Sequence, residues 1–463
     1  MRLHTLEKYI IYSFLFIFAV HILFSINVGS SYTLTRIIVI LMLTFLILYY
    51  LEEFNKSQNL LQYQFIYFFF LYLFIQSYFS TYINTKFEYF QHQLIVFYLF
   101  LFTHTQLILH NINVRFSIKK FLLITTYTFL VLLVFILIYS LIKRISPTNS
   151  IEILFDNRRF FNHIQTIMTP ILLYMLFTLK SRFLKTIFAF IFFFNIFLIF
   201  NTGARGTLYS LILASFIIYV TSIQNKKVKH MIIVLHILFI ASFIFQQYID
   251  SLNLFENSHS EHFKSVNSSG RFYIYSTLSN YIFDKNYIFT SIGFASQDVA
   301  QTGFLHPHNL ILYIFLGSGT FGLVVFLYIF INYLYLCSKK NLSLRHNQNS
   351  LYKIFYFTFL AVFFHSLLSG IYITPLVSIF IFYFLIMYHQ INFVQKKFIS
   401  TDIYPKTTLL NLYLNKATKV ILFLIVLYSF YLIKQNLDLF IFYNGLEHHT
   451  NIPGIFMFNE RIY

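Results

Sequence analysis

The sequence predicts an all-α, polytopic integral membrane protein, because three features of composition and patterning agree. Hydrophobic residues make up 58% of the 463 residues and charged residues only 10%, whereas soluble domains carry about 25% charged residues. The apolar residues gather into runs of about 20, which is the length an α-helix needs to cross a bilayer. The short segments between these runs alternate between rich and poor in Lys and Arg, as expected for helices that pass back and forth through a membrane.

The apolar runs define about 12–13 expected transmembrane helices. Their ranges are 9–29, 33–51, 60–80, 88–109, 119–142, 163–179, 184–201, 205–224, 229–247, 309–335, 351–368, 372–392 and 417–434. A further apolar tail follows the last run, so twelve helices is an alternative. With the N-terminus in the cytoplasm, most of the 33 basic residues fall in inner loops, and the net charge of +18 indicates contact with anionic lipid rather than nucleic-acid binding.

This topology divides the chain into three parts. N-terminal transmembrane helices occupy 1–142, a central region occupies 143–335, and C-terminal helices with a tail occupy 336–463. The central region holds one large outer loop, 248–308, which is the longest polar stretch of the chain. The single cysteine, Cys337, excludes an internal disulfide and a cysteine-based metal site.

Two short segments on the outer side carry arginines, although the positive-inside rule places most Lys and Arg residues in the cytoplasm. The presence of these arginines therefore needs another explanation. The segment FDNRRFFNHIQT places Arg159, Asn162 and Gln165 where a helix begins, and FNTGARGTLYS places Arg205 between two glycines at the start of the next helix. The N-terminus of a helix and the guanidinium fork both suit a phosphate-like anion. A plain alternative, arginines that reach toward lipid headgroups, remains open for both segments.

Two further motifs follow in and after the large loop. SSGRFYIYS carries Arg271, and TGFLHPHNLILYIF places His306, His308 and Asn309 directly before an apolar helix. Histidine can act as a general base near neutral pH, and asparagine suits a helix N-cap. The alternatives are a solvated loop arginine, a structural histidine and a metal site, although a metal needs more ligands and no carboxylate lies close in sequence.

Taken in order, these motifs resemble those of the O-antigen ligase superfamily, which includes lipid A-core O-antigen ligases, O-antigen and capsule polymerases and pilin-type protein O-oligosaccharyltransferases. TGARGTLYSLILA is similar to the family's arginine–glycine turn, GRFYIYSTLSNYIF to its G-R-x-x-x-W/Y segment and HPHNLILYIF to its H-x-H-N-x-x-L motif. The resemblance is concentrated between about Phe155 and Leu323. One departure is Gly317, which stands where many members carry an acidic residue.

The resemblance implies a metal-independent glycosyltransferase of the bacterial inner membrane, without a cofactor and with its active site facing the periplasm. Its donor would be a glycan on undecaprenyl diphosphate and its acceptor a saccharide, lipid A-core in the ligase case. The residues with implied catalytic roles are His308, Arg205 and Arg271, and those with implied substrate-binding roles are Arg159, Asn162, Gln165, His306 and Asn309.

Other functions remain open. A repeat-unit polymerase and a protein O-oligosaccharyltransferase would use the same donor, and the motifs do not encode the acceptor. A polysaccharide transporter or flippase is an alternative of another class. Such transporters often show internal repeats and charges at the membrane midplane, whereas this sequence has no internal repeat and its polar groups cluster at one interface.

Overall fold

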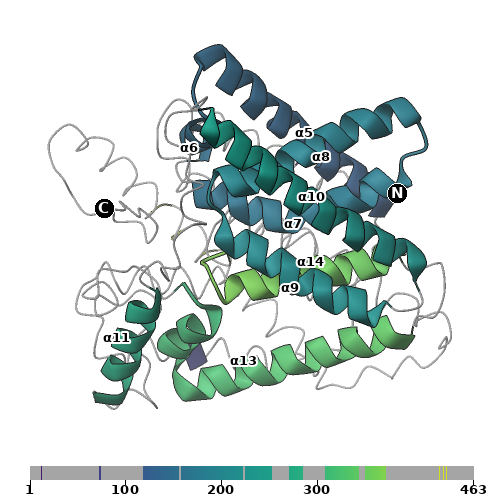
Figure 1. Ribbon diagram of the computed structural model, residues 1–463. Coiled ribbons are helices and arrows are strands. Elements are labelled where there is room, and N and C mark those ends of the chain that lie inside the picture. The colour runs from purple at the N-terminus through teal and green to yellow at the C-terminus, as the bar shows by residue number, and fades with distance from the viewer. Residues whose placement is uncertain are drawn as a thin grey trace, which may run out of the picture. The chain divides into compact units, whose positions relative to one another are not determined.

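A computed structural model describes residues 118–155, 158–222, 225–252, 271–284, 308–343 and 350–371, together with the single residues 12, 72, 73, 427, 431 and 434 (Figure 1). These ranges form nine helices and contain no strand, which confirms the predicted all-α class. The chain divides into two compact units, and each is described by itself. The first comprises Met1–Ser31, Arg115–Ser268 and Asn332–Asn392, and the second comprises Tyr32–Val114, Ser269–Ile331 and Phe393–Tyr463.

The first unit holds most of the described helices. They are α5 (Ile118–Lys143), α6 (Pro147–Phe155), α7 (Arg158–Thr178), α8 (Arg182–Asn201), α9 (Arg205–Thr221), α10 (Lys226–Ser251) and α14 (Ser350–Ser366). The second unit holds α11 (Arg271–Asp284) and the greater part of α13 (Leu310–Ser343).

Seven of the predicted membrane spans coincide with described helices. Five of these helices, α5, α7, α8, α10 and α13, are long and apolar enough to cross a membrane. Helices α9 and α14 are shorter, at 17 residues each. The other six predicted spans lie outside the described ranges, apart from isolated residues.

Helix α7 lies at the centre of the first unit. Within its most apolar window, 83% of the residues are buried, against 33–44% for α5, α8 and α10. It packs against α14 and α8, while α14 also lies along α9 and α10 lies along α8 (Figure 1). The outer faces of α8 and α10 expose large apolar side chains such as Phe190 and Ile240, as expected for surfaces that meet lipid. The surrounding helices therefore shield α7, and this explains how it can carry many polar side chains.

The sequence predicts no helix between the spans 119–142 and 163–179, but the structure forms the short helix α6 there. Pro147 stands at its first position, where the missing N–H costs nothing. The Ser146 hydroxyl accepts a hydrogen bond from the backbone N–H of Asn149 at 3.1 Å. Buried Phe155 then packs at a tilted angle against Phe161 of α7, with ring centroids 5.4 Å apart. This apolar face holds α6 against the start of α7.

Helix α7 contains a proline in its interior, Pro170. Proline has no backbone N–H, so the carbonyl four residues earlier, that of Thr166, receives no helical hydrogen bond from it. The turn between these two residues is therefore the weakest part of the helix backbone.

Helix α13 of the second unit breaks at Gly319, whose backbone angles are φ 67° and ψ −172°. Only glycine adopts this region readily. The Tyr72 hydroxyl donates a hydrogen bond of 3.1 Å to the backbone carbonyl of Ser318, and the Tyr72 ring meets Phe321 edge-on at 5.0 Å. Tyr72 thus contacts Ser318 before the break and Phe321 after it.

Candidate functional site

The turn between α8 and α9 is a tight reversal built on Gly203. Gly203 has φ 67°, in the left-handed region. Its N–H donates to the carbonyl of Phe200 at 3.1 Å, and the N–H of Ala204 donates to the carbonyl of Ile199 at 2.9 Å. This hydrogen-bond pair is the Schellman motif, which ends a helix with a left-handed glycine. The motif allows α9 to begin at Arg205, only two residues after the glycine.

The first turn of α9 lacks a side-chain cap from its N-cap residue. Ala204 occupies the N-cap position and makes no side-chain hydrogen bond to the helix. Backbone N–H groups at a helix start attract anions when no side chain satisfies them. Arg205 begins this helix and is partly exposed. A guanidinium and a helix N-terminus therefore lie together, as predicted from the TGARG sequence.

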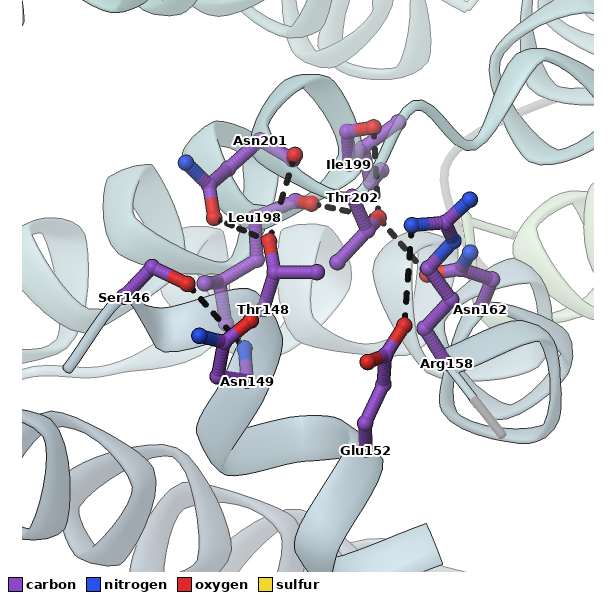
Figure 2. Close-up of polar contacts among 10 residues, drawn as sticks. All are labelled: Ser146, Thr148, Asn149, Glu152, Arg158, Asn162, Leu198, Ile199, Asn201 and Thr202. Atoms are coloured by element: carbon purple, nitrogen blue, oxygen red, sulfur yellow. Dashed lines mark hydrogen bonds and ion pairs between the residues drawn. The ribbon is translucent and has the colours of Figure 1, made fainter. Parts of the chain in front are cut away.

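The start of α7 contacts this turn through buried Asn162. Its side-chain oxygen accepts a hydrogen bond of 2.9 Å from the Thr202 hydroxyl, which also lies 2.7 Å from the carbonyl of Leu198 (Figure 2). One helical turn earlier, Arg158 forms an ion pair of 3.5 Å with Glu152 of α6 (Figure 2). The neighbouring Arg159 is partly exposed. Asn162 is therefore a direct link between α7 and the turn that precedes Arg205.

A buried cluster around His365 lies beside the same turn. Nδ1 of His365, in the last turn of α14, lies 2.6 Å from the Thr166 hydroxyl. The Thr166 hydroxyl also lies 3.2 Å from that of Thr207, and Thr207 donates to the backbone carbonyl of Asn162 at 2.9 Å. His163 meets the His365 ring edge-on with centroids 4.9 Å apart.

Two further polar groups bind α8 to its neighbours. Thr148 of α6 donates to the Asn201 side chain at 2.6 Å, and Asn201 in turn reaches Gln246 of α10 at 3.4 Å. Deeper in the unit, Gln165 donates to the side chain and the backbone carbonyl of Asn195 at 3.1 and 2.9 Å. Asn195 donates onward to Thr169. Gln165, predicted to bind substrate, thus contacts α8.

We use the name polar belt for the buried side chains that connect the ends of five helices at the α8–α9 turn. Its members are Asn162, His163, Thr166, Asn201, Thr202, Thr207, Gln246 and His365. They come from α7, the end of α8, the start of α9, the end of α10 and the end of α14. Buried polar groups inside a membrane protein are costly unless they are paired, and they often mark functional regions. The polar belt surrounds the base of the turn that carries Arg205.

The second unit holds the remaining described candidates. The Asn309 side chain accepts hydrogen bonds from the backbone N–H groups of Ile311 and Leu312 at 2.9 and 3.1 Å, which confirms that it caps α13. His308 precedes it with φ 49°, a left-handed conformation that is uncommon for a residue with a side chain and is often found at functional sites. Arg271 is the first residue of α11. His306 lies outside the described residues.

The structure brings some of the predicted residues together and adds two that the sequence did not single out. Arg205 and Asn162 lie on either side of the α8–α9 turn in the first unit, whereas Arg271, His308 and Asn309 belong to the second unit. The two additions are His163 and His365, whose rings meet edge-on. A histidine within an apolar span was the one signal for His365. The roles assigned to all these residues stay predictions.

Metal ligation finds no support within the ranges that the structure describes. They contain no group of three or more His, Cys, Asp or Glu residues arranged to hold a metal ion. The two clustered histidines of the polar belt, His163 and His365, contact hydroxyl groups instead: His163 lies 3.0 Å from Ser369, and His365 lies 2.6 Å from Thr166.

The helices and the polar belt define a class: an all-α, multi-pass membrane protein with a buried polar region around a helix start that carries the partly exposed Arg205. Comparison with known protein families then shows what a part of the chain is similar to. The O-antigen ligase family model matches residues 188–327, which confirms the resemblance of this segment to the O-antigen ligase superfamily. The match covers less than a third of the chain and supports an enzyme of the ligase or polymerase type. No curated protein and no solved structure matched the chain.

Proposed function

We propose that the protein is an inner-membrane glycosyltransferase that moves a glycan from undecaprenyl diphosphate to a saccharide acceptor at the periplasmic face. The observation that carries this proposal is Arg205 at the uncapped start of α9, inside the segment 188–327 that matches the O-antigen ligase family. In the ligase form of the reaction, the acceptor is lipid A-core.

Arg205 and the first turn of α9 would bind the diphosphate of the donor. When the bond between the sugar and the diphosphate breaks, its electron pair stays with the diphosphate oxygen, and negative charge grows there. A guanidinium and backbone N–H groups aimed at that charge stabilise the transition state more than the ground state, and this difference accelerates the reaction. The fixed Schellman turn favours such a role, because it holds these donors in place before the substrate arrives.

His308 would receive the proton of the attacking acceptor hydroxyl. The hydroxyl oxygen forms the new bond to the anomeric carbon as the diphosphate leaves, and its proton passes to the imidazole, so atoms and charge balance. The left-handed backbone of His308 and the cap formed by Asn309 support a fixed position for this side chain at the start of α13. Arg271 would add a second cation for the diphosphate.

Three of the predicted substrate-binding residues lie on α7. Arg159 is partly exposed and would contact the diphosphate or a sugar. Asn162 would act by fixing the turn, because its side-chain oxygen already accepts a hydrogen bond from Thr202 at 2.9 Å. Gln165 is fully buried against Asn195, so we assign it to packing between α7 and α8 rather than to the substrate.

The test is glycan transfer by purified protein in lipid nanodiscs with an undecaprenyl-diphosphate-linked glycan. Arg205→Ala should lower kcat about 100-fold or more, the size typical for loss of one group that stabilises a developing anion. Arg205→Lys should lose less, because it keeps the charge but not the planar fork. Arg182→Ala is the matched control, because Arg182 is exposed and begins α8, at the end of that helix far from the α8–α9 turn. Full transfer by Arg205→Ala would refute the proposed function.

The acceptor is decided by a second experiment on whole cells. Surface glycans of a deletion strain are compared with those of the same strain carrying the wild-type gene. A ligase predicts that all glycan disappears from lipid A-core in the deletion strain. If single repeat units still reach the core, the protein is a polymerase, and if only glycoproteins change, it is a protein O-oligosaccharyltransferase.

A further inference from the structure

His365 lies at the end of α14, outside the segment 188–327 that matches the O-antigen ligase family. Its side chain is buried, with 3% of its surface exposed. Burial of an imidazole among apolar helices costs free energy unless its nitrogens are hydrogen-bonded, and an apolar ring would fill the same space without that cost. The presence of a histidine here therefore needs a reason beyond packing.

The His365 ring packs directly against the first turn of α9. A β-carbon added to Gly206 would lie 3.1 Å from Nε2 and 3.3 Å from Cδ2 of His365. The ring thus occupies the space that a side chain at position 206 would need. Gly206 follows Arg205 in the chain, so the imidazole supports the turn that carries the guanidinium.

Hydrogen bonds hold the other edge of the ring. Nδ1 of His365 lies 2.6 Å from the Thr166 hydroxyl, which is itself 3.2 Å from the hydroxyl of Thr207 in the first turn of α9. His163 packs edge-on against the ring and lies 3.0 Å from the Ser369 hydroxyl through its own Nε2. The ring is therefore restrained by Thr166 and His163 of α7 and by the start of α9, and Ser369 restrains His163 in turn. It cannot shift without changing one of these contacts.

We propose that His365 is a positioning residue, which fixes the first turn of α9 and through it the orientation of Arg205. The proposal rests on the proposed function of Arg205. It extends the functional region to α7 and α14, which supply the restraints on this turn from outside the matched segment. His163 restrains His365 in the same way, one step further from Arg205.

The test compares three single variants. His365→Asn keeps a hydrogen-bonding atom near the position of Nδ1. His365→Phe replaces the imidazole with an aromatic ring that has no nitrogen. Thr166→Val removes the partner hydroxyl with little change of shape. We expect Phe and Val to lower kcat about 10–100-fold, as a misplaced catalytic group does, while the KM for the donor changes little and Asn restores most of kcat. Thr358→Val is the control, because Thr358 is a buried residue of α14 whose hydroxyl bonds the carbonyl of Ile354 in its own helix.

A double-mutant cycle separates positioning from general damage to the fold. If His365 acts through Arg205, His365→Phe causes no further loss of kcat in an Arg205→Lys background. Additive losses, or a folded His365→Phe protein with a kcat within about threefold of wild type, overturn the proposal. If His365→Phe does not accumulate as a monodisperse protein, Thr166→Val gives the same test from the other side of the contact.

The two proposals can fail separately. Full activity of Arg205→Ala would refute the function proposed for Arg205 and the role of His365 with it. An inactive Arg205→Ala protein beside fully active His365→Phe and Thr166→Val proteins would refute only the positioning role. Gly206→Ala provides an independent check: we expect it to lower kcat, since its new methyl group meets a restrained ring at 3.1 Å.

Discussion

Replacement of Gly203 by alanine tests whether the α8–α9 turn depends on a left-handed backbone. Gly203 has φ 67°, and its N–H and that of Ala204 close the two hydrogen bonds that end α8. A residue with a β-carbon costs about 1–2 kcal/mol in this region. The loss is not offset by helix propensity, because the position is not helical. We therefore expect Gly203→Ala to lower the free energy of unfolding by about 1–2 kcal/mol.

The matched comparison is Gly203→Asn, since asparagine enters the left-handed region more readily than other residues with side chains. Unfolding is followed by SDS titration of the protein in mixed micelles, with tryptic cleavage after Arg205, the first residue of α9, as a second readout. We expect the order of stability to be wild type, then Asn, then Ala. Equal stability of all three proteins, or Asn less stable than Ala, would show that the turn does not require the left-handed conformation.

A change in the turn at Gly203 should also affect glycan transfer, because Arg205 follows Gly203 by only two residues. A change in the turn moves the guanidinium relative to the donor diphosphate. We expect kcat of Gly203→Ala to fall more than that of Gly203→Asn, in the same nanodisc assay used for Arg205. A less stable Gly203→Ala protein that keeps full kcat would separate the turn from the reaction.

Three other predictions concern single contacts. Thr202→Val removes the 2.9 Å hydrogen bond to Asn162 and should lower the free energy of unfolding by about 0.6–2 kcal/mol in the SDS titration. Thr202→Ser keeps the hydroxyl and should lower it less. Equal losses in both variants would contradict a role for the bond. Gly319→Ala places a β-carbon at φ 67° and ψ −172°, so we expect a loss of about 1–3 kcal/mol by the same titration, and an unchanged protein would show that the break in α13 tolerates other residues. Asn309→Ala removes the cap of α13 at a cost of about 1 kcal/mol. Hydrogen exchange of the Ile311 and Leu312 amides should then become about fivefold faster, whereas Asn309→Ser should retain most protection and equal rates in both variants would argue against the cap.

The helical architecture could be predicted because its cause is local. A run of about 20 apolar residues is sufficient to place a spanning helix, and α5, α8 and α10 lie where such runs occur. Helix α6 escaped prediction because nine residues are too few for a periodic signal, and its stability comes from packing of Phe155 on Phe161. The central place of α7 also escaped prediction. It depends on which helices surround it, and a single sequence does not carry that information.

The candidate site was predictable only in part, because some of its contacts are local in sequence and others join distant segments. The TGARG turn is a local pattern, since its glycine and arginine lie within three residues, and the structure forms the turn expected from it. The His365–Thr166 contact joins residues 199 positions apart. Histidine in an apolar run is unusual, but the sequence alone does not single out His365, and nothing in the run indicates its partner. Gln165 shows the converse: the family resemblance implies a substrate-binding role, which stays a prediction, whereas its buried contact with Asn195 of α8 could not be read from the sequence.

The missing backbone bond at Pro170 has a mechanical consequence for α7. The part of α7 that precedes Thr166 is joined to the rest of the helix by fewer backbone hydrogen bonds than in an unbroken helix, because Pro170 donates none. Its direction must then be determined by its neighbours, through Asn162 on Thr202 and Thr166 on His365. The part of α7 before Thr166 can therefore tilt relative to the rest of the helix. Its angle is set by the contact of Asn162 near its start and by that of Thr166 at its end, so a change in one contact affects the other.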